Sequence, residues 1–444
     1  MRIGCFMIKF LISSLLFVAL TGCFHDSDDD PVKDDFLQDF GGDTAKSDSP
    51  RDTQPLVQAG DLSAQISNNS DFALKIFQNM VSGSSQENKN IVFSPFSISQ
   101  AMVMLSAGAA NNTLEEINQG LMLNTDQAIL HPSFNQLDLD FTSRAGTYTR
   151  SDNSQGELLL NISNALWGQT GYEFEGPFLD VLAINHGAGI NLLNFTDDAE
   201  LARTEINQWV ATQTKDKIID AMPPNSVNSD TRLVLTNTVY LKADWLSPFS
   251  VASTSDLEFN KLDASIVTVP FMSQRGVFAY KEEAGVIVVE LPFVGDKLEM
   301  VLVMPDSVDF ETYESTLTQA ILNSLILSLQ STDVRLTMPK FNFKSEVSLK
   351  TELQSLGVID AFNEGVADFS AMDGTTNLFV QSAIHKAFIT VEESGVEAGA
   401  FTGISIGTTS APPSIVINKP FLFMIRDKVN GSILFLGRVL DPSA

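Results

Sequence analysis

The chain has 444 residues, of which 44% are hydrophobic, and a formal net charge of −28 at pH 7. A chain of this length can bury a core large enough to be stable without disulfides. The acidic balance argues against polyanionic partners, so we expect no binding to nucleic acid and no charge-driven binding to an anionic membrane surface.

Residues 1–22 have the pattern of a lipoprotein signal peptide. A basic start precedes an apolar run over residues 10–20, and Leu20-Thr21-Gly22-Cys23 has the form of a lipobox. The run is shorter than the roughly 20 apolar residues that span a bilayer, and an ordinary secretory signal, the other alternative, needs no cysteine there. We therefore expect Cys23 to be lipidated. Because Phe24 rather than Asp follows, the pattern resembles that of sorted bacterial lipoproteins, which implies a lipid anchor at the bacterial cell envelope, in the outer membrane or at the cell surface.

The segment after this cysteine has a different composition. Residues 24–61 hold eleven Asp, no Glu and three basic residues. Low hydrophobicity with high net charge cannot offset the entropy of ordering the chain, so we expect residues 23–65 to form a disordered tether. A calcium-binding tract is the alternative, but the segment has no 12-residue loop with an acidic terminal ligand. With Cys5 removed in the signal peptide, the mature chain can form no internal disulfide.

Residues 66–444 show helix and strand patterns without a linker-like break, and we expect one folded domain. Four apolar residues between positions 72 and 80 follow a helical spacing. Ser94-Pro95 is a typical helix start, a capping residue followed by proline in the first turn. Residues 286–304 and 334–343 have the composition of strands.

Residues 392–413 are the most informative stretch of the chain. Apolar, β-branched residues before it (386–391) and after it (415–417 and 421–425) predict strands on both sides. The residues between are mostly Gly, Ala, Ser and Thr, too small to anchor a loop, yet those from 395 to 400 carry little to forbid an extended strand. This pattern is typical of a segment that exists in two states, as an exposed loop and as an inserted strand.

The same stretch contains a formal match to the G-x-S-x-G motif of α/β-hydrolases at residues 403–407. That motif acts on a sharp turn between a strand and a helix. Here Pro412-Pro413 follows, which cannot continue a helix, and His186 and His385 are the only histidines left as candidate bases. The sequence therefore disfavours a hydrolase.

Further motifs in the chain resemble those of the serpin family of serine protease inhibitors, over about residues 66–444. Each motif alone is a weak pattern, but their common order is specific. The resemblance implies an α+β fold of three β-sheets and eight or nine helices, with an exposed reactive-centre loop. The motifs are residues 90–98 (NIVFSPFSI), 237–242 (NTVYLK), 290–293 (ELPF), 338–341 (MPKF), 385–387 (HKA) and 435–439 (FLGRV).

The resemblance implies that the chain is not an enzyme but an inhibitor consumed as a suicide substrate. A serine protease cuts the loop, is held as an acyl-enzyme, and is disabled when the loop inserts into the main sheet. Counting forward from the hinge glycine, Gly395, and back from Pro412-Pro413 places the reactive bond at Thr409–Ser410. Small residues around this bond favour elastase-like or subtilisin-like targets. The alternative is a non-inhibitory serpin-fold binding protein, which the mostly small hinge residues disfavour.

The resemblance also implies roles for particular residues. In an inserted strand, alternation would place Val396, Ala398, Ala400 and Thr402 toward the core, and Glu397, Gly399 and Phe401 toward solvent. We expect a Lys340–Glu393 ion pair beside the point where the loop enters the sheet. The implied site residues are the hinge (Glu393, Gly395, Val396, Glu397, Ala398, Gly399, Ala400), a polar "shutter" beneath the sheet (Ser94, Ser97, Asn237, His385) and the entry "breach" (Trp245, Lys340).

We expect no metal site and no cofactor. Many serpins are activated by heparin through basic residues on one helix, but the corresponding residues 121–140 contain no Lys or Arg, so heparin activation is not expected. The expected partners are a target serine protease and, through the lipid anchor, a membrane, and the protein is expected to be a monomer.

Overall fold

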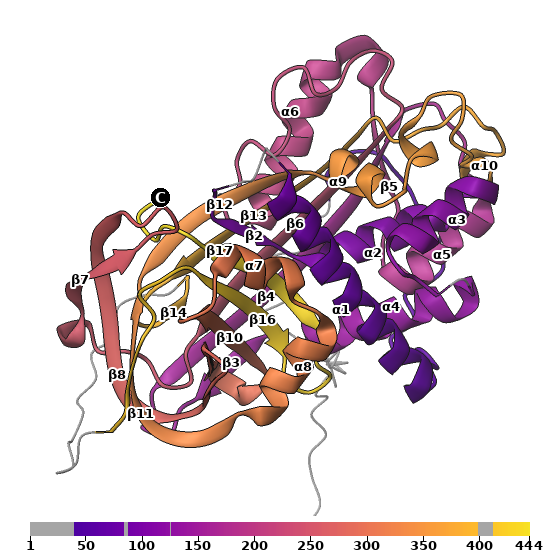
Figure 1. Ribbon diagram of the computed structural model, residues 1–444. Coiled ribbons are helices and arrows are strands. Elements are labelled where there is room, and N and C mark those ends of the chain that lie inside the picture. The colour runs from indigo at the N-terminus through magenta and orange to yellow at the C-terminus, as the bar shows by residue number, and fades with distance from the viewer. Residues whose placement is uncertain (1–39, 84–87, 125, 398–411) are drawn as a thin grey trace, which may run out of the picture.

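The computed structural model describes residues 40–83, 88–124, 126–397 and 412–444 (Figure 1). Several expectations lie outside these residues: the signal peptide, the lipidated Cys23, the G-x-S-x-G match, the hinge residues Ala398, Gly399 and Ala400, and the reactive bond Thr409–Ser410.

Among the described residues, the main sheet has eight strands, in the order β1-β5-β4-β6-β14-β13-β12 with β3 paired to β4. It contains the long strands that cross the middle of the molecule in Figure 1. Its strands are β1 (Thr44–Ala45), β3 (Gly146–Thr149), β4 (Gln155–Gln169), β5 (Ile190–Leu193), β6 (Leu233–Asp244), β12 (Phe341–Ser348), β13 (Ser382–Val391) and β14 (Gly395–Val396).

The second sheet has nine strands in the part of the chain that the structure describes, in the order β15-β11-β8-β9-β10-β16-β17-β2 with β7 paired to β8. Its strands are β2 (Ile91–Phe93), β7 (Ser255–Asn260), β8 (Ile266–Glu283), β9 (Val286–Pro292), β10 (Leu298–Pro305), β11 (Gln330–Pro339), β15 (Ser414–Val416), β16 (Phe421–Asp427) and β17 (Ile433–Val439).

The described residues form ten α-helices rather than the expected eight or nine; α10 has only four residues. They are α1 (Ala59–Ser82), α2 (Pro95–Ser106), α3 (Asn111–Gly120), α4 (Gln127–Thr142), α5 (Gly176–His186), α6 (Phe195–Gln213), α7 (Phe310–Thr316), α8 (Gln319–Ser328), α9 (Leu349–Ser355) and α10 (Ser370–Asp373).

The expected three sheets are joined into two hydrogen-bonded sheets in this structure. The reason is β8, which is 18 residues long. Along its length it pairs with β7, β9 and β11. The strands on both of its sides therefore belong to one hydrogen-bonded sheet. The predicted α+β class is unaffected.

Both faces of the main sheet are covered, α2 lying against one and α6 against the other. The sequence of β4 shows why. Leu158 and Leu160 point into the core around α2, whereas Leu159 and Trp167 point into the smaller core under α6. A strand with apolar residues at consecutive positions requires apolar packing on both sides.

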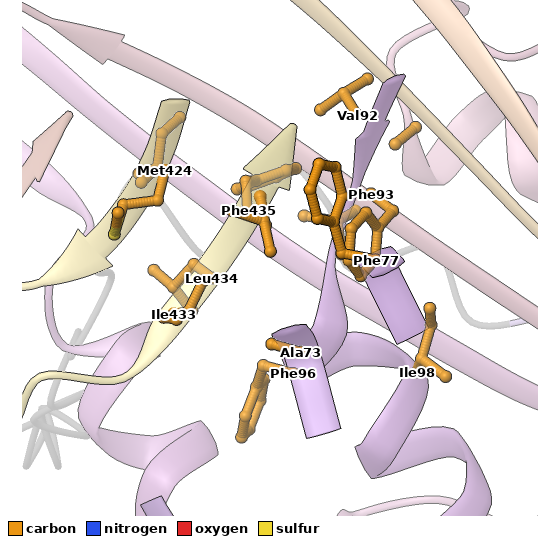
Figure 2. Close-up of a cluster of buried hydrophobic side chains, with 14 of the residues drawn as sticks. Ala73, Phe77, Val92, Phe93, Phe96, Ile98, Met424, Ile433, Leu434 and Phe435 are labelled. Carbon is orange, nitrogen blue, oxygen red and sulfur yellow. The ribbon is translucent and has the colours of Figure 1, made fainter. Parts of the chain in front are cut away.

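Helix α2 is the central helix, and every one of its residues is buried. Ser94 caps it as predicted, its side chain accepting a hydrogen bond from the Ser97 backbone N–H, and Pro95 follows in the first turn. Figure 2 shows the core beside it, where side chains from α1, α2, β2, β16 and β17 meet. Among them, the rings of Phe77 and Phe93 stack with centroids 6.4 Å apart.

Residues 40–58, here called the N-terminal strap, are part of the fold, so the expectation of a disordered tether up to residue 65 is wrong for residues 40–65. Strand β1 pairs antiparallel with β5, and helix α1 already begins at Ala59. The Phe40 ring packs edge-on against Trp167, with centroids 5.2 Å apart.

Polar contacts hold the rest of the strap. Arg51 pairs with Asp138 on α4 at 2.5 Å, and its Nε donates to Asn135 at 2.9 Å. Ser49 donates to Asp180 on α5 at 3.1 Å. The strap is ordered by an existing sheet edge and by charged partners, and not mainly by apolar side chains of its own, so its composition does not reveal that it is ordered.

Candidate functional site

The main sheet is partly open between β6 and β13, a boundary that we call the seam. The two strands pair directly, in parallel, only from Val234 and Ser382 to Thr238 and Lys386. Beyond that point β14 lies between them and pairs with both. The seam is therefore closed at one end and already occupied by two residues of the hinge at the other.

The first hinge residues fit this position closely. Val396 pairs with Val391 on β13 and with Ala243 on β6, and it is 2% exposed. Gly395 lies so near β6 that a Cβ atom there would be 2.2 Å from the carbonyl oxygen of Ala243. Only glycine can occupy this position without moving the strand. Val396 faces the core, the face assigned to it from alternation.

Glu397 marks the point where the hinge leaves the sheet. Its backbone N–H donates to the Thr390 carbonyl at 2.8 Å, which continues the ladder, but its φ is +53°, in the left-handed region. Its carboxylate pairs with Lys217 at 2.9 Å and accepts from the Tyr240 hydroxyl at 3.2 Å. The expectation that Glu397 faces solvent is wrong, because the connection after α6 covers this face of the sheet.

Trp245, the residue after β6, joins the sheet to the segment that enters it. Its indole Nε1–H donates to the Glu392 carbonyl at 2.9 Å, and its backbone N–H donates to the Ser394 carbonyl at 2.8 Å. Its ring stacks on Phe293 with centroids 4.8 Å apart. Trp245 is thus a core residue that also binds the chain at the open end of the seam.

The expected ion pair is present beside it. Lys340 Nζ lies 2.8 Å from a Glu393 carboxylate oxygen, and Thr254 donates to the other at 2.7 Å. Burial alone would raise the pKa of Glu393, but the hydrogen bonds from Lys340 and Thr254 outweigh it and hold the pKa below its usual value. Glu393 is therefore ionised and fixed at neutral pH.

At the closed end of the seam, the four shutter residues are brought together and are all buried. The Asn237 side chain donates to the Ser97 backbone carbonyl and hydroxyl, both at 2.6 Å. The His385 ring bonds to the Asn237 side-chain oxygen on one side. On the other, its Nε2 accepts from the Ser94 backbone N–H at 3.1 Å.

These bonds fix the state of the His385 ring. Because Nε2 accepts a hydrogen bond, the proton of the neutral ring is on Nδ1, where it is donated to Asn237. Burial lowers the pKa of His385 to about 3. The ring is therefore neutral at physiological pH, and it links β13, β6 and the start of α2.

Asn164 and Gln100 belong to the same network, and sequence reasoning missed both. Asn164 accepts from Asn237 and Ser97, and donates to Gln100 at 3.0 Å. A polar residue in the apolar run of β4 was a detectable signal for Asn164. No such signal exists for Lys217 or Tyr240, because their contact with Glu397 depends on the path of the chain after α6.

The other candidate base, His186, lies against a second histidine. His131 Nδ1 is 3.2 Å from His186 Nε2, and burial lowers the pKa of both, that of His131 to about 4. In the part of the chain that the structure describes, no group of three or more His, Cys, Asp or Glu side chains is placed to hold a metal ion. No described helix is both long and apolar enough to cross a bilayer.

Comparisons with known proteins agree with this geometry. Residues 67–442 match the model of one family, described as serpin (serine protease inhibitor). The chain is 34% identical over 380 residues to the leukocyte elastase inhibitor of Xenopus tropicalis, a match that covers 84% of this chain and 97% of the relative.

Solved structures show the same fold. A thermophilic serpin, Tengpin, in its native state matches with a TM-score of 0.76 and 26% identity, over 89% of this chain and 97% of that one. Thyroxine-binding globulin in complex with thyroxine matches with a TM-score of 0.75 and 28% identity, over 85% and 99%. The predicted α+β fold is thus confirmed, and with a family match over most of its length the chain belongs to the serpin family.

Proposed function

We propose that this serpin inhibits serine proteases as a suicide substrate, by cleavage of its reactive loop, trapping of the acyl-enzyme and insertion of the loop into the main sheet. The similarity to an elastase inhibitor supports protease inhibition in general. The observation that carries the mechanism is the seam, where Gly395 and Val396 already lie between β6 and β13. Insertion needs only to continue a strand that has begun.

The register of the hinge predicts where each inserted residue would lie. Val396 is opposite Val391 and Ala243 in antiparallel pairs. Continuing both ladders brings Thr402 between His385 and Asn237, at the shutter. The hydrogen bond between the His385 and Asn237 side chains must then break. The Thr402 hydroxyl, which can both donate and accept, can take the place of Asn237 for His385 and of His385 for Asn237.

The chemistry is that of an interrupted hydrolysis. The protease serine attacks the Thr409 carbonyl carbon, the peptide bond to Ser410 breaks, Ser410 leaves as an amine, and Thr409 remains as an ester on the protease. Insertion of residues 395–409 carries that ester about 46 Å, at about 3.3 Å per residue. Displacing catalytic groups by even an ångström slows deacylation by orders of magnitude.

The residues around the bond favour proteases with a small, apolar specificity pocket. Thr408, Thr409, Ser410 and Ala411 offer no Arg, Lys or aromatic side chain. We therefore propose elastase-like or subtilisin-like enzymes as the target class, over trypsin-like ones.

The test is to mix the purified chain, lacking only its signal peptide, with an elastase, a subtilisin and trypsin. We expect an SDS-stable complex with elastase or subtilisin, and a released fragment that begins at Ser410 within two residues. A loop that is cut without any covalent complex would instead support the non-inhibitory alternative. Rapid complex formation with trypsin and none with any elastase would contradict the proposed target class.

We further propose that Cys23 anchors the protein to the bacterial envelope, at the outer membrane or cell surface. The support is the lipobox in the sequence. Fractionation of cells that produce Cys23→Ser should move the protein from the membrane to the soluble fraction with its thermal stability unchanged, since the strap begins well after the anchor. Unchanged membrane partitioning of the variant would contradict the proposal.

A further inference from the structure

We propose that Lys217 and Tyr240 are positioning residues for strand insertion, which hold Glu397 on the α6 side of the sheet so that the cut loop enters in the register begun by Val396. This inference rests on the proposed inhibitory mechanism. Sequence reasoning assigned no role to either residue.

The contacts come from two separate elements. Lys217, in the connection after α6, lies 2.9 Å from Glu397 Oε1, and the hydroxyl of Tyr240, on β6, donates to the same oxygen at 3.2 Å. The Glu397 side chain is 15% exposed, so its charge is largely removed from water. A buried carboxylate needs such partners, and their positions determine where it lies.

The connection that carries Lys217 is itself fixed over the seam. Lys215 and Asp216 both adopt left-handed backbone conformations, with φ of +47° and +60°. The Asp216 N–H donates to the Ala211 carbonyl at 2.8 Å, and Thr214 accepts from the Ile218 N–H at 3.2 Å. Two consecutive non-glycine residues in this region are costly, and they persist only where the surroundings determine them.

The two lysines of this turn lie over the two strands that must separate. Lys215 Nζ is 5.7 Å from the ring centroid of Tyr240 on β6, and Lys217 Nζ is 5.9 Å from that of Phe388 on β13. The two rings meet across the seam, with centroids 6.0 Å apart and their planes tilted by 48°. The turn after α6 is therefore in contact with both sides of the opening and with the hinge.

This arrangement guides insertion and does not oppose it. Side chains alternate along a strand, so Glu397 stays on the α6 side when Val396 stays on the core side. Its ladder bond to Thr390 is already made. As the strand continues, the φ of Glu397 must change from +53° to the extended region, which relieves strain while the ion pair to Lys217 is kept.

Loss of the pair should affect one step only. The cut loop has two fates, insertion with the protease trapped or hydrolysis with the protease released. Without Lys217, the hinge enters the correct register more slowly, and more protease escapes. For an ion pair with this exposure, we expect the ratio of released to trapped protease to rise roughly 1.5- to five-fold.

The experiment is to titrate elastase or subtilisin with the parent chain and with Lys217→Ala, Tyr240→Phe and Lys217→Arg, and to measure inhibitor molecules consumed per trapped protease. The matched control is Lys428→Ala. Lys428 is as exposed as Lys217 (39% against 40%) and pairs with Asp296 at 2.8 Å, away from the seam. Its partner is more exposed than Glu397 (57% against 15%), and it also lies 3.9 Å from the buried Glu299. Lys217→Ala and Tyr240→Phe should raise the consumption, whereas Lys217→Arg and Lys428→Ala should match the parent. The rate of the first cut and the melting temperature of the uncut protein should hardly change.

A charge reversal separates positioning from general damage. Lys217→Glu should raise the consumption further than Lys217→Ala, and Lys217→Glu combined with Glu397→Lys should bring it back toward the parent.

If the parent traps protease and Lys217→Ala traps it equally well, the inference is overturned and the proposed function stands. If the parent itself is only cut, the proposed function fails. In that case the test is the rise in melting temperature that each protein shows on cleavage. If this rise is not larger for the parent than for Lys217→Ala, the inference is overturned.

Discussion

His385 on β13 and Asn237 on β6 hydrogen-bond to each other across the seam, within the short stretch where these strands are directly paired. The same bond belongs to the network that ties both strands to the start of α2. The sheet is therefore held closed by polar groups that a new strand must separate.

Removing the Asn237 side chain should weaken the uncut protein. Asn237→Ala leaves the buried His385 Nδ1–H without an acceptor and removes a donor from the Ser97 hydroxyl and from Asn164. Orphaned buried groups cost about 1–3 kcal/mol each. We expect a loss of about 2–4 kcal/mol, measured as a lower urea midpoint. The control is Asn342→Ala, which removes an exposed bond to Thr390 at 3.2 Å in the same sheet. Equal midpoints for the two variants would contradict a role for the shutter network in stability.

The buried histidine predicts a loss of stability in acid. Folding lowers the pKa of His385 to about 3 from 6.5. Its contribution is therefore complete above pH 6.5 and is lost as the pH falls toward 3, by about 2 kcal/mol between pH 6.5 and 5. Glu290 acts in the opposite direction, because burial, with the adjacent Glu299, raises its pKa to about 7. The effect of His385 on the pH dependence of stability must therefore be measured by comparing the parent with a variant that lacks this histidine.

The comparison is the urea midpoint of the parent and of His385→Gln at pH 7 and pH 5. The variant should be less stable than the parent at pH 7, but its midpoint should fall less between the two pH values. An identical fall in both proteins would show that His385 does not titrate in this range.

Much of the fold was predictable from the sequence because the motifs that resemble serpins are local. Ser94 and Pro95 start a helix by local capping interactions alone, and the orientation of Val396 toward the core follows from strand alternation. Contacts between distant segments were not predictable from pattern alone. The partner of Glu397 depends on a strained turn about 180 residues earlier, at Lys215–Lys217.

The prediction that the N-terminal strap is disordered was wrong for a different reason. Its composition is that of a disordered segment, and the energy that orders it comes from the edge of β5 and from charged groups on α4 and α5. Composition reports only what a segment can bury by itself. It does not report an unpaired sheet edge elsewhere in the chain with which the segment can pair.

The strap predicts a stability effect that a flexible tether would not have. Arg51→Ala removes a half-buried ion pair to Asp138 and a hydrogen bond to Asn135. We expect a loss of about 1–2 kcal/mol, seen as a lower melting temperature. The control is Asp48→Asn, at an exposed position of the same strap. If both variants melt with the parent, the docking of the strap in solution is contradicted.

The register of insertion predicts a size limit at Gly399. Continuing the ladders from Val396 brings residue 399 between Tyr240 and Phe388, on the face where their rings meet. A Cβ atom is tolerable there, but a branched side chain would collide with one ring or the other. Gly399→Ala should raise inhibitor consumption slightly and Gly399→Val strongly, in the titration of protease described above. Equal trapping by both variants would mean that the register is shifted.

The most direct measurement compares the parent chain with Val396→Arg after mixing each with elastase or subtilisin. Val396 is buried in the seam, and an unpaired arginine there would cost several kcal/mol. For the parent we expect an SDS-stable complex and a large gain in heat stability on cleavage. For Val396→Arg we expect cleavage at the same bond, no accumulating complex and little gain in heat stability. A variant that traps protease as efficiently as the parent would contradict the claim that trapping works by inserting this strand between β6 and β13.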